Sequence, residues 1–132
     1  MEVSRQHGAT FVLALWSAGF LVGTVTHTVD LALGGLNVYA GFPPPVRVFW
    51  VSLTVLDALV VVLLWRRLRA AVVLAVMIVV CDVGINTAVL VVHGGLSPFG
   101  LVLQMMFGLL VIATAPWLWG RLRTHRVSPI AP

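Results

Sequence analysis

Four long runs of apolar residues, separated by short polar or glycine- and proline-rich segments, make up most of the chain. They cover about residues 9–33, 46–65, 70–93 and 99–119. A helix of about 20 apolar residues is long enough to cross the hydrocarbon core of a bilayer, and each run reaches that length. The pattern therefore predicts an all-α, polytopic membrane protein with four transmembrane helices in an antiparallel bundle.

The segments between the runs contain residues that typically end or begin helices. Gly34–Gly35 follow the first run, Pro43–Pro45 precede the second, and Gly94–Gly95 follow the third. The turn at Arg66–Arg69 is so short that the second and third helices should be antiparallel neighbours. We expect a single integral membrane domain followed by a flexible tail over residues 120–132.

Composition and charge support a location in a membrane. The chain is 61% hydrophobic and only 9% charged, and its mean hydropathy is +1.10. All eight basic residues are arginines, and they gather at both chain ends and in the 66–69 turn, with only Arg47 on the opposite side. Positive residues favour the cytoplasmic side, so we expect both termini in the cytoplasm and the protein in a bacterial plasma (inner) membrane.

The same features exclude several other classes of protein. Arginines scattered between apolar runs do not form the continuous basic surface that nucleic acid needs, so no nucleic acid is expected as a partner. The single cysteine, Cys81, excludes an intramolecular disulfide and a cysteine-based metal site.

Tyr39 and Trp50, near a predicted membrane boundary, are expected in an interfacial aromatic belt.

Polar residues inside the apolar runs indicate a functional site. Asp57 lies near the middle of the second run, and Asp82 and Asn86 lie one turn apart in the third. A charge at this depth costs about 2.5–3.5 kcal/mol on insertion scales, so both carboxyl groups should point into the bundle. The two carboxyl groups should lie at similar depth. We expect a hydrogen bond between them, either directly, through one water or through Asn86, so that they can share one proton. The alternative is a purely structural role in holding the helices together.

Other polar and aromatic residues complete the expected site. His27 and Asp30 share one face late in the first helix, and Gln104 lies in the fourth. His27, Asp30 and His93 can also supply two histidines and a carboxylate for a metal ion, but neither a metal nor another cofactor is expected. The catalytic candidates are Asp57 and Asp82. The ligand-binding candidates are Asn86, His27, Asp30, Gln104, Trp16 and Phe20. The apolar walls of the site are expected to be formed by Trp16, Phe20, Met105 and Phe107.

With His27 and Asp30 late in the first helix and Asp57 within the second, the layout resembles the EXPERA domain. That family includes proteins of the sterol delta-8/delta-7 isomerase and sigma-2 receptor type. The resemblance implies a lipophilic cavity in a four-helix bundle, where acidic side chains protonate or bind a sterol-like or amine ligand. The chain departs from the family in placing a further acid, Asp82, in its third helix. The segments FWVSLTVLD and DVGIN are also similar to small uncharacterised bacterial four-helix membrane proteins.

These observations predict a protein that binds or transforms a lipophilic molecule of the lipid, terpenoid or sterol-like kind in an outward-facing cavity of the bundle. If it is an enzyme, an acid/base isomerase or cyclase is expected, with Asp57 and Asp82 as acid and base. Two alternatives stay open, an accessory or assembly subunit of a membrane complex and an oligomeric proton-coupled transporter of small molecules. The expected partners are membrane lipids, a lipophilic small molecule, and a second copy of the chain or a membrane partner subunit.

Overall fold

The computed structural model describes residues 2–122, without the side chains of residues 2–6 and 36. The described part is helical and contains no strand, and all four of its α-helices are long and apolar enough to cross a membrane. The predicted all-α bundle is therefore confirmed, and the chain is a small multi-pass membrane protein. Most of the predicted flexible tail, from residue 123 on, lies outside the described residues. The helices are α1 (Glu2–Gly34), α2 (Pro44–Trp65), α3 (Ala70–Val92) and α4 (Pro98–Trp119), with a short 3₁₀ helix η1 (Gly35–Asn37) after α1.

Local sequence signals explain most of these boundaries. α2 begins at Pro44 rather than at residue 46, because proline is well suited to the first turn of a helix, where its missing N–H is not needed. The Ser97 hydroxyl accepts a hydrogen bond of 3.2 Å from the Gly100 amide and caps the start of α4. Gly94 and Gly95 end α3 with φ angles of +68° and +78°, a backbone region that favours glycine.

α1 is longer than the apolar run that predicted it. It starts at Glu2 rather than near residue 9, because the polar residues before the run include good helix formers such as Glu2, Arg5 and Gln6. Hydropathy marks only the part of a helix that lies in hydrocarbon, so the polar first turns were not included in the predicted span.

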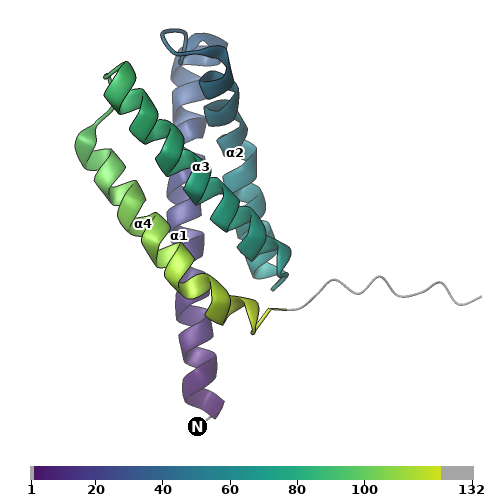
Figure 1. Cartoon of the computed structure of the whole chain (residues 1–132). Helices are drawn as coiled ribbons and strands as arrows, with labels where there is room; N and C mark the ends of the chain where they lie inside the picture. Colours follow the sequence, from purple (N-terminus) through teal and green to yellow (C-terminus); the bar gives the residue numbers. More distant parts are fainter. Residues whose placement is uncertain (1, 123–132) are drawn as a thin grey trace, which may run out of the picture.

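The four helices form two hairpins, α1–α2 and α3–α4 (Figure 1). We call the end with residues 35–43 and 93–97 the loop end, and the end with residues 66–69, the start of α1 and the end of α4 the termini end. Near the termini end, α1 and α4 are in contact, and Trp16 donates a hydrogen bond of 3.0 Å to the Thr114 hydroxyl. Toward the loop end, the α3–α4 hairpin leans away from α1 (Figure 1).

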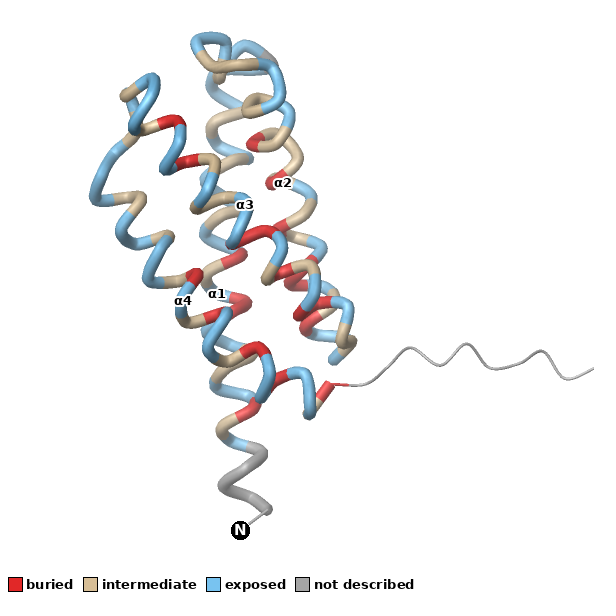
Figure 2. The backbone as a smooth tube through the Cα atoms, viewed as in Figure 1, coloured by how far each residue is buried: buried red, intermediate tan, exposed pale blue. Residues whose placement is uncertain are grey.

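The tightest packing lies in the termini half of the bundle (Figure 2). Trp16, Val60, Val111 and Leu118 are each 0% exposed there. Large apolar side chains also cover the outside of every helix, for example Leu33 at 85% exposed. An apolar outer surface suits a bilayer, where lipid tails replace water as the solvent.

Candidate functional site

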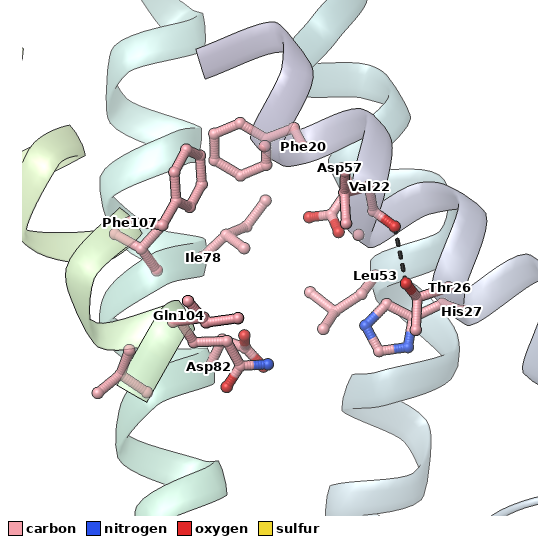
Figure 3. A pocket seen from close by; sticks show the side chains of 15 residues that line it. Phe20, Val22, Thr26, His27, Leu53, Asp57, Ile78, Asp82, Gln104 and Phe107 are labelled. Carbon is pink, nitrogen blue, oxygen red and sulfur yellow. Dashed lines mark hydrogen bonds between the residues drawn. The ribbon is translucent and has the colours of Figure 1, made fainter. Parts of the chain in front are cut away.

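A cavity of about 340 Å³ lies between the four helices. It is near the lower end of the range for small-molecule pockets. Asp57 of α2 and Asp82 of α3 both line it, at different sides of the open space (Figure 3). Both acids therefore face the interior of the bundle. The main apolar side chains of its walls are Phe20, Leu53, Ile78, Val79 and Phe107.

Asp57 is the most isolated polar group of the site. Its side chain is only 5% exposed, and its Oδ1 atom makes no hydrogen bond among the described residues. The other oxygen lies so close to α1 that a Cβ atom added at Gly23 would fall on it. A buried polar atom without a partner costs about 1–3 kcal/mol, and Oδ1 is also shielded from solvent.

A hydrogen-bonded network orients the other polar groups of the cavity. Trp50 donates a hydrogen bond of 2.8 Å to the amide oxygen of Asn86. Since an indole N–H can only donate, this contact fixes which end of the Asn86 amide is oxygen. The Asn86 amide nitrogen then donates to Asp82 Oδ1 at 3.0 Å and to Gln104 Oε1 at 2.8 Å. One oxygen of Asp82 and the NH₂ group of Gln104 are left to face the cavity.

A second network lies between the cavity and the loop end. The Tyr39 hydroxyl donates a hydrogen bond of 2.8 Å to Asp30 Oδ2, and His27 Nδ1 lies 3.2 Å from the same hydroxyl. Because the hydroxyl hydrogen is committed to Asp30, the imidazole Nδ1–H is the donor to the Tyr39 oxygen. Burial and the hydrogen bond to Asp30 both raise the pKa of the Tyr39 hydroxyl, so it keeps its proton.

The structure brings five of the predicted site residues to the cavity wall, namely Asp57, Asp82, His27, Gln104 and Phe20. Phe107, predicted as an apolar wall, lines it as well.

Four other predicted residues do not reach the cavity wall. Asn86 lies behind it, because its amide is used by Trp50, Asp82 and Gln104. Asp30 is held by Tyr39, Trp16 is buried against Thr114, and Met105 is 45% exposed on the outside of the bundle.

The predicted hydrogen bond between Asp57 and Asp82 is not present, either directly or through Asn86. Asp82 uses Oδ1 to accept from Asn86, whereas Asp57 Oδ1 has no partner in the described part of the chain. The reason is that Asn86 points toward Trp50 and α4, and both of its N–H donors are used by Asp82 and Gln104. The two acids share a cavity instead of a hydrogen bond.

The candidate metal ligands His27, Asp30 and His93 do not assemble. No three His, Cys, Asp or Glu side chains come together as a metal-binding group among residues that the structure describes. His27 and Asp30 both bind Tyr39, while His93 is exposed where α3 ends. The cause is the lean of the α3–α4 hairpin away from α1 at the loop end (Figure 1).

The sequence did not reveal the roles of Tyr39, Trp50 and Gly23. Tyr39 and Trp50 were predicted as membrane-interface aromatics, yet both use their polar atoms in the site networks, and their rings meet edge to face with centroids 5.0 Å apart. Gly23 leaves space for the Asp57 carboxyl group. A signal was present in each case, since tyrosine and tryptophan need a hydrogen-bond partner when buried and a glycine inside a helix often marks a close approach.

No protein-family model, curated protein or solved structure matches the chain. Its class therefore follows from its own fold and site. It is a small multi-pass membrane protein whose described residues form four long helices, with a cavity between them that is lined by two carboxyl groups, an amide and an imidazole.

Proposed function

We propose that the protein binds a lipophilic molecule of the lipid, terpenoid or sterol-like kind in the cavity, with Asp57 and Asp82 as its polar anchors. The observation that carries this proposal is the placement of two carboxyl groups, Asp57 of α2 and Asp82 of α3, in the wall of a ligand-sized cavity between the helices. The Asp57 oxygen without a partner is shielded from the cavity, so a ligand donates to it once the carboxyl group turns toward the open space, and this contact removes the cost of leaving the oxygen unpaired.

The shape of the cavity favours entry of the ligand from the bilayer. Val22 on α1 and Leu103 on α4 line the cavity and are also 67% and 50% exposed on the outside of the bundle. α1 and α4 are joined nearer the termini end, where the Phe20 and Phe107 rings pack with centroids 5.3 Å apart. The open side therefore faces lipid tails, and a ligand dissolved in the membrane can enter between α1 and α4.

The polar groups of the cavity favour a ligand with a hydroxyl group. Asp82 offers an oxygen that accepts a hydrogen bond, and Gln104 offers an NH₂ group that donates one. A hydroxyl can satisfy both groups at once, because it donates and accepts. The cavity volume of about 340 Å³ accommodates the head of such a molecule, while a longer tail can extend through the open side into the bilayer.

The same geometry allows acid/base chemistry on a bound molecule. Asp57 and Asp82 approach it from two helices, so one carboxyl group can donate a proton while the other accepts one. An isomerase or cyclase of a lipophilic alcohol fits this arrangement. The resemblance to the EXPERA domain implies a lipophilic ligand as well, with His27 and Asp57 at its site.

Mass spectrometry of the lipid extract of the purified protein tests the proposal. We expect the wild-type extract to contain one enriched molecule at roughly one copy per protein chain. Asp57→Asn should retain about tenfold less of it, because loss of one charge-assisted hydrogen bond weakens binding by about 1.4 kcal/mol. Ser17→Ala is the matched control, since Ser17 is a buried polar residue of α1 that does not line the cavity. A wild-type extract with no enriched molecule, or equal retention by Asp57→Asn, contradicts the proposal.

The same preparation separates this function from the two alternatives. A protein that copurifies in fixed proportion in mild detergent indicates an accessory subunit. Proton movement into proteoliposomes that depends on an added substrate and disappears with Asp57→Asn indicates a transporter.

A further inference from the structure

The carboxyl groups of the cavity are remote from the aqueous phase. Every residue that lines the cavity belongs to one of the four membrane-spanning helices. Its open side, at Val22 and Leu103, lies on the lipid-facing surface. Hydrocarbon does not carry protons, so a proton that reaches or leaves Asp57 or Asp82 needs a route through polar groups of the protein.

We propose that Asp30, Tyr39 and His27 form a proton path that joins the cavity to the aqueous phase at the loop end. The path rests on the proposed function in one respect, since it supplies protons to the same cavity carboxyl groups. It adds Tyr39 and Asp30, neither of which lines the cavity, as residues that act on the site through His27.

The hydrogen bonds of the path run in one continuous direction. His27 lines the cavity and places Nδ1 3.2 Å from the Tyr39 hydroxyl, which donates at 2.8 Å to Asp30. Nδ1 faces Tyr39, so Nε2 is the imidazole nitrogen left for the cavity side. Asp30 lies one turn beyond His27, in the last turns of α1 before Gly34. The three groups thus lead from mid-membrane toward the end of the helix.

Each transfer along this path balances without any further reactant. A cavity carboxylic acid gives its proton through a water molecule in the cavity to His27 Nε2, the proton on Nδ1 passes to the Tyr39 oxygen, and the Tyr39 hydroxyl proton passes to Asp30. The cavity acid ends as a carboxylate, Asp30 ends protonated and releases its proton to water, and His27 ends in its other neutral tautomer. The reverse sequence returns a proton to the cavity and restores the first tautomer.

The surroundings of His27 and Tyr39 suit a relay. The ionisable groups that face His27 are Asp30 and Tyr39 on the loop side and Asp57 and Asp82 across the cavity. The raised pKa of Tyr39 keeps its hydroxyl protonated. In the relay the hydroxyl accepts one proton as it donates another, so the side chain stays neutral. The edge of Trp50, at 5.0 Å between ring centroids, holds the Tyr39 ring in place.

Time-resolved infrared spectroscopy of the full chain in lipid nanodiscs, with no ligand added, tests the path. The carbonyl stretch of a protonated cavity carboxyl group, assigned by its loss in Asp57→Asn or Asp82→Asn, is followed after a step in pH. Tyr39→Phe removes only the relay hydroxyl. Asp30→Asn keeps an oxygen that accepts the hydrogen bond from Tyr39, but the amide cannot take up a proton. This variant therefore preserves the hydrogen bond and interrupts the path. Thr28→Val is the control, since the Thr28 hydroxyl is exposed and bonds only to its own helix.

We expect Tyr39→Phe and Asp30→Asn to slow the appearance of the band by a factor on the order of a hundred, with an unchanged final amplitude, and Thr28→Val to leave the rate unchanged. If both variants equilibrate as fast as the wild type, the path is wrong, even when their melting temperatures fall. If Tyr39→Phe does not fold, the rate of Asp30→Asn decides alone. Absence of any cavity carboxyl band in the wild type overturns the path, whereas a copurified lipophilic molecule would still support ligand binding.

Discussion

Asn86 and Gly23 determine the geometry of the site although neither is expected to carry its chemistry. Asn86 is 6% exposed and uses its amide oxygen and nitrogen on three partners from three helices. Gly23 leaves the space that the Asp57 carboxyl group occupies. In both cases the residue acts by positioning a neighbour, which is visible only when the partners are known.

Replacing Asn86 should loosen the network as a whole. Asn86→Leu leaves the Trp50 N–H, the Gln104 carbonyl and an oxygen of Asp82 without partners, so we expect the free energy of unfolding to fall by about 1–3 kcal/mol. Thr87→Val is the control, because the Thr87 hydroxyl is exposed and bonds only to the Val83 carbonyl of its own helix. Unfolding in mixed detergent micelles measures both variants, and equal stabilities would show that the network has no net effect on the fold.

Adding one methyl group at two glycines should have opposite effects. Gly84 has no atom within 4 Å of an added Cβ, so Gly84→Ala should stabilise α3 by up to about 1 kcal/mol, because alanine is the better helix former. In Gly23→Ala the new Cβ falls on the Asp57 carboxyl group, which must move. We expect a lower melting temperature and less copurified molecule with Gly23→Ala, and a similar response of the two variants would show that the Gly23 contact is unimportant.

At the scale of the helices, the α2–α3 turn also holds the end of α4. Arg69 Nε donates hydrogen bonds of 3.1 Å to the carbonyl oxygens of Trp119 and Leu122, and its guanidinium carbon lies 5.2 Å from the centre of the Trp119 ring. Carbonyl groups at the end of a helix have no partner within it and favour a cation. The arginine cluster that indicated membrane orientation therefore has a second role, to join the two hairpins at the termini end.

Removal of the Arg69 side chain should free the end of α4. We expect Arg69→Leu to increase amide hydrogen exchange over residues 118–122, by an amount that corresponds to about 1.5–3 kcal/mol for hydrogen bonds to a charged group. Arg66→Leu removes the same charge from the same turn and serves as the control, since Arg66 is exposed. If both variants exchange alike, surface charge rather than the contact with α4 is responsible.

At the scale of the whole molecule, the four helices pack together at the termini end, whereas α4 diverges from α1 toward the loop end (Figure 1). The termini half is filled by Trp16, Val60 and Leu118, each without exposed surface, whereas in the loop half α2 and α3 are joined by the hydrogen bond from Trp50 to Asn86. Among the arginines with described side chains, Arg66, Arg67, Arg69 and Arg121 lie at the termini end, and Arg47 lies near the loop end. The prediction that follows is a termini end in the cytoplasm and a loop end on the opposite side.

Cysteine labelling in intact cells tests this orientation. With Cys81→Ser as the background, a membrane-impermeant maleimide should react with the thiol introduced by His93→Cys and should not react with that introduced by Arg66→Cys, since both positions are exposed but at opposite ends. Permeabilised cells, in which both variants should react, provide the control. Labelling of Arg66→Cys alone in intact cells would reverse the orientation and place the proposed proton path on the cytoplasmic side.

The sequence by itself determined the number of long helices in the described part of the chain, the approximate ends of α2, α3 and α4, and the positions of the polar residues along them. These properties depend on local quantities, namely the length of each apolar run, the glycines and prolines at its ends, and the rise of a helix along its axis. The expectation that Asp57 and Asp82 face the interior follows from the same reasoning, because a carboxyl group in lipid costs several kcal/mol.

Only the tertiary structure decided which polar groups meet. That outcome depends on the rotation and tilt of each helix, which are set by packing against its neighbours rather than by its own sequence. The rotation of α3 turns Asn86 toward Trp50 and Gln104, so it does not bridge the two acids. The fold of the α1–α2 connection brings Tyr39 back onto α1, where it joins His27 to Asp30. Contacts of this kind join residues from different segments, and no pattern within one segment contains them.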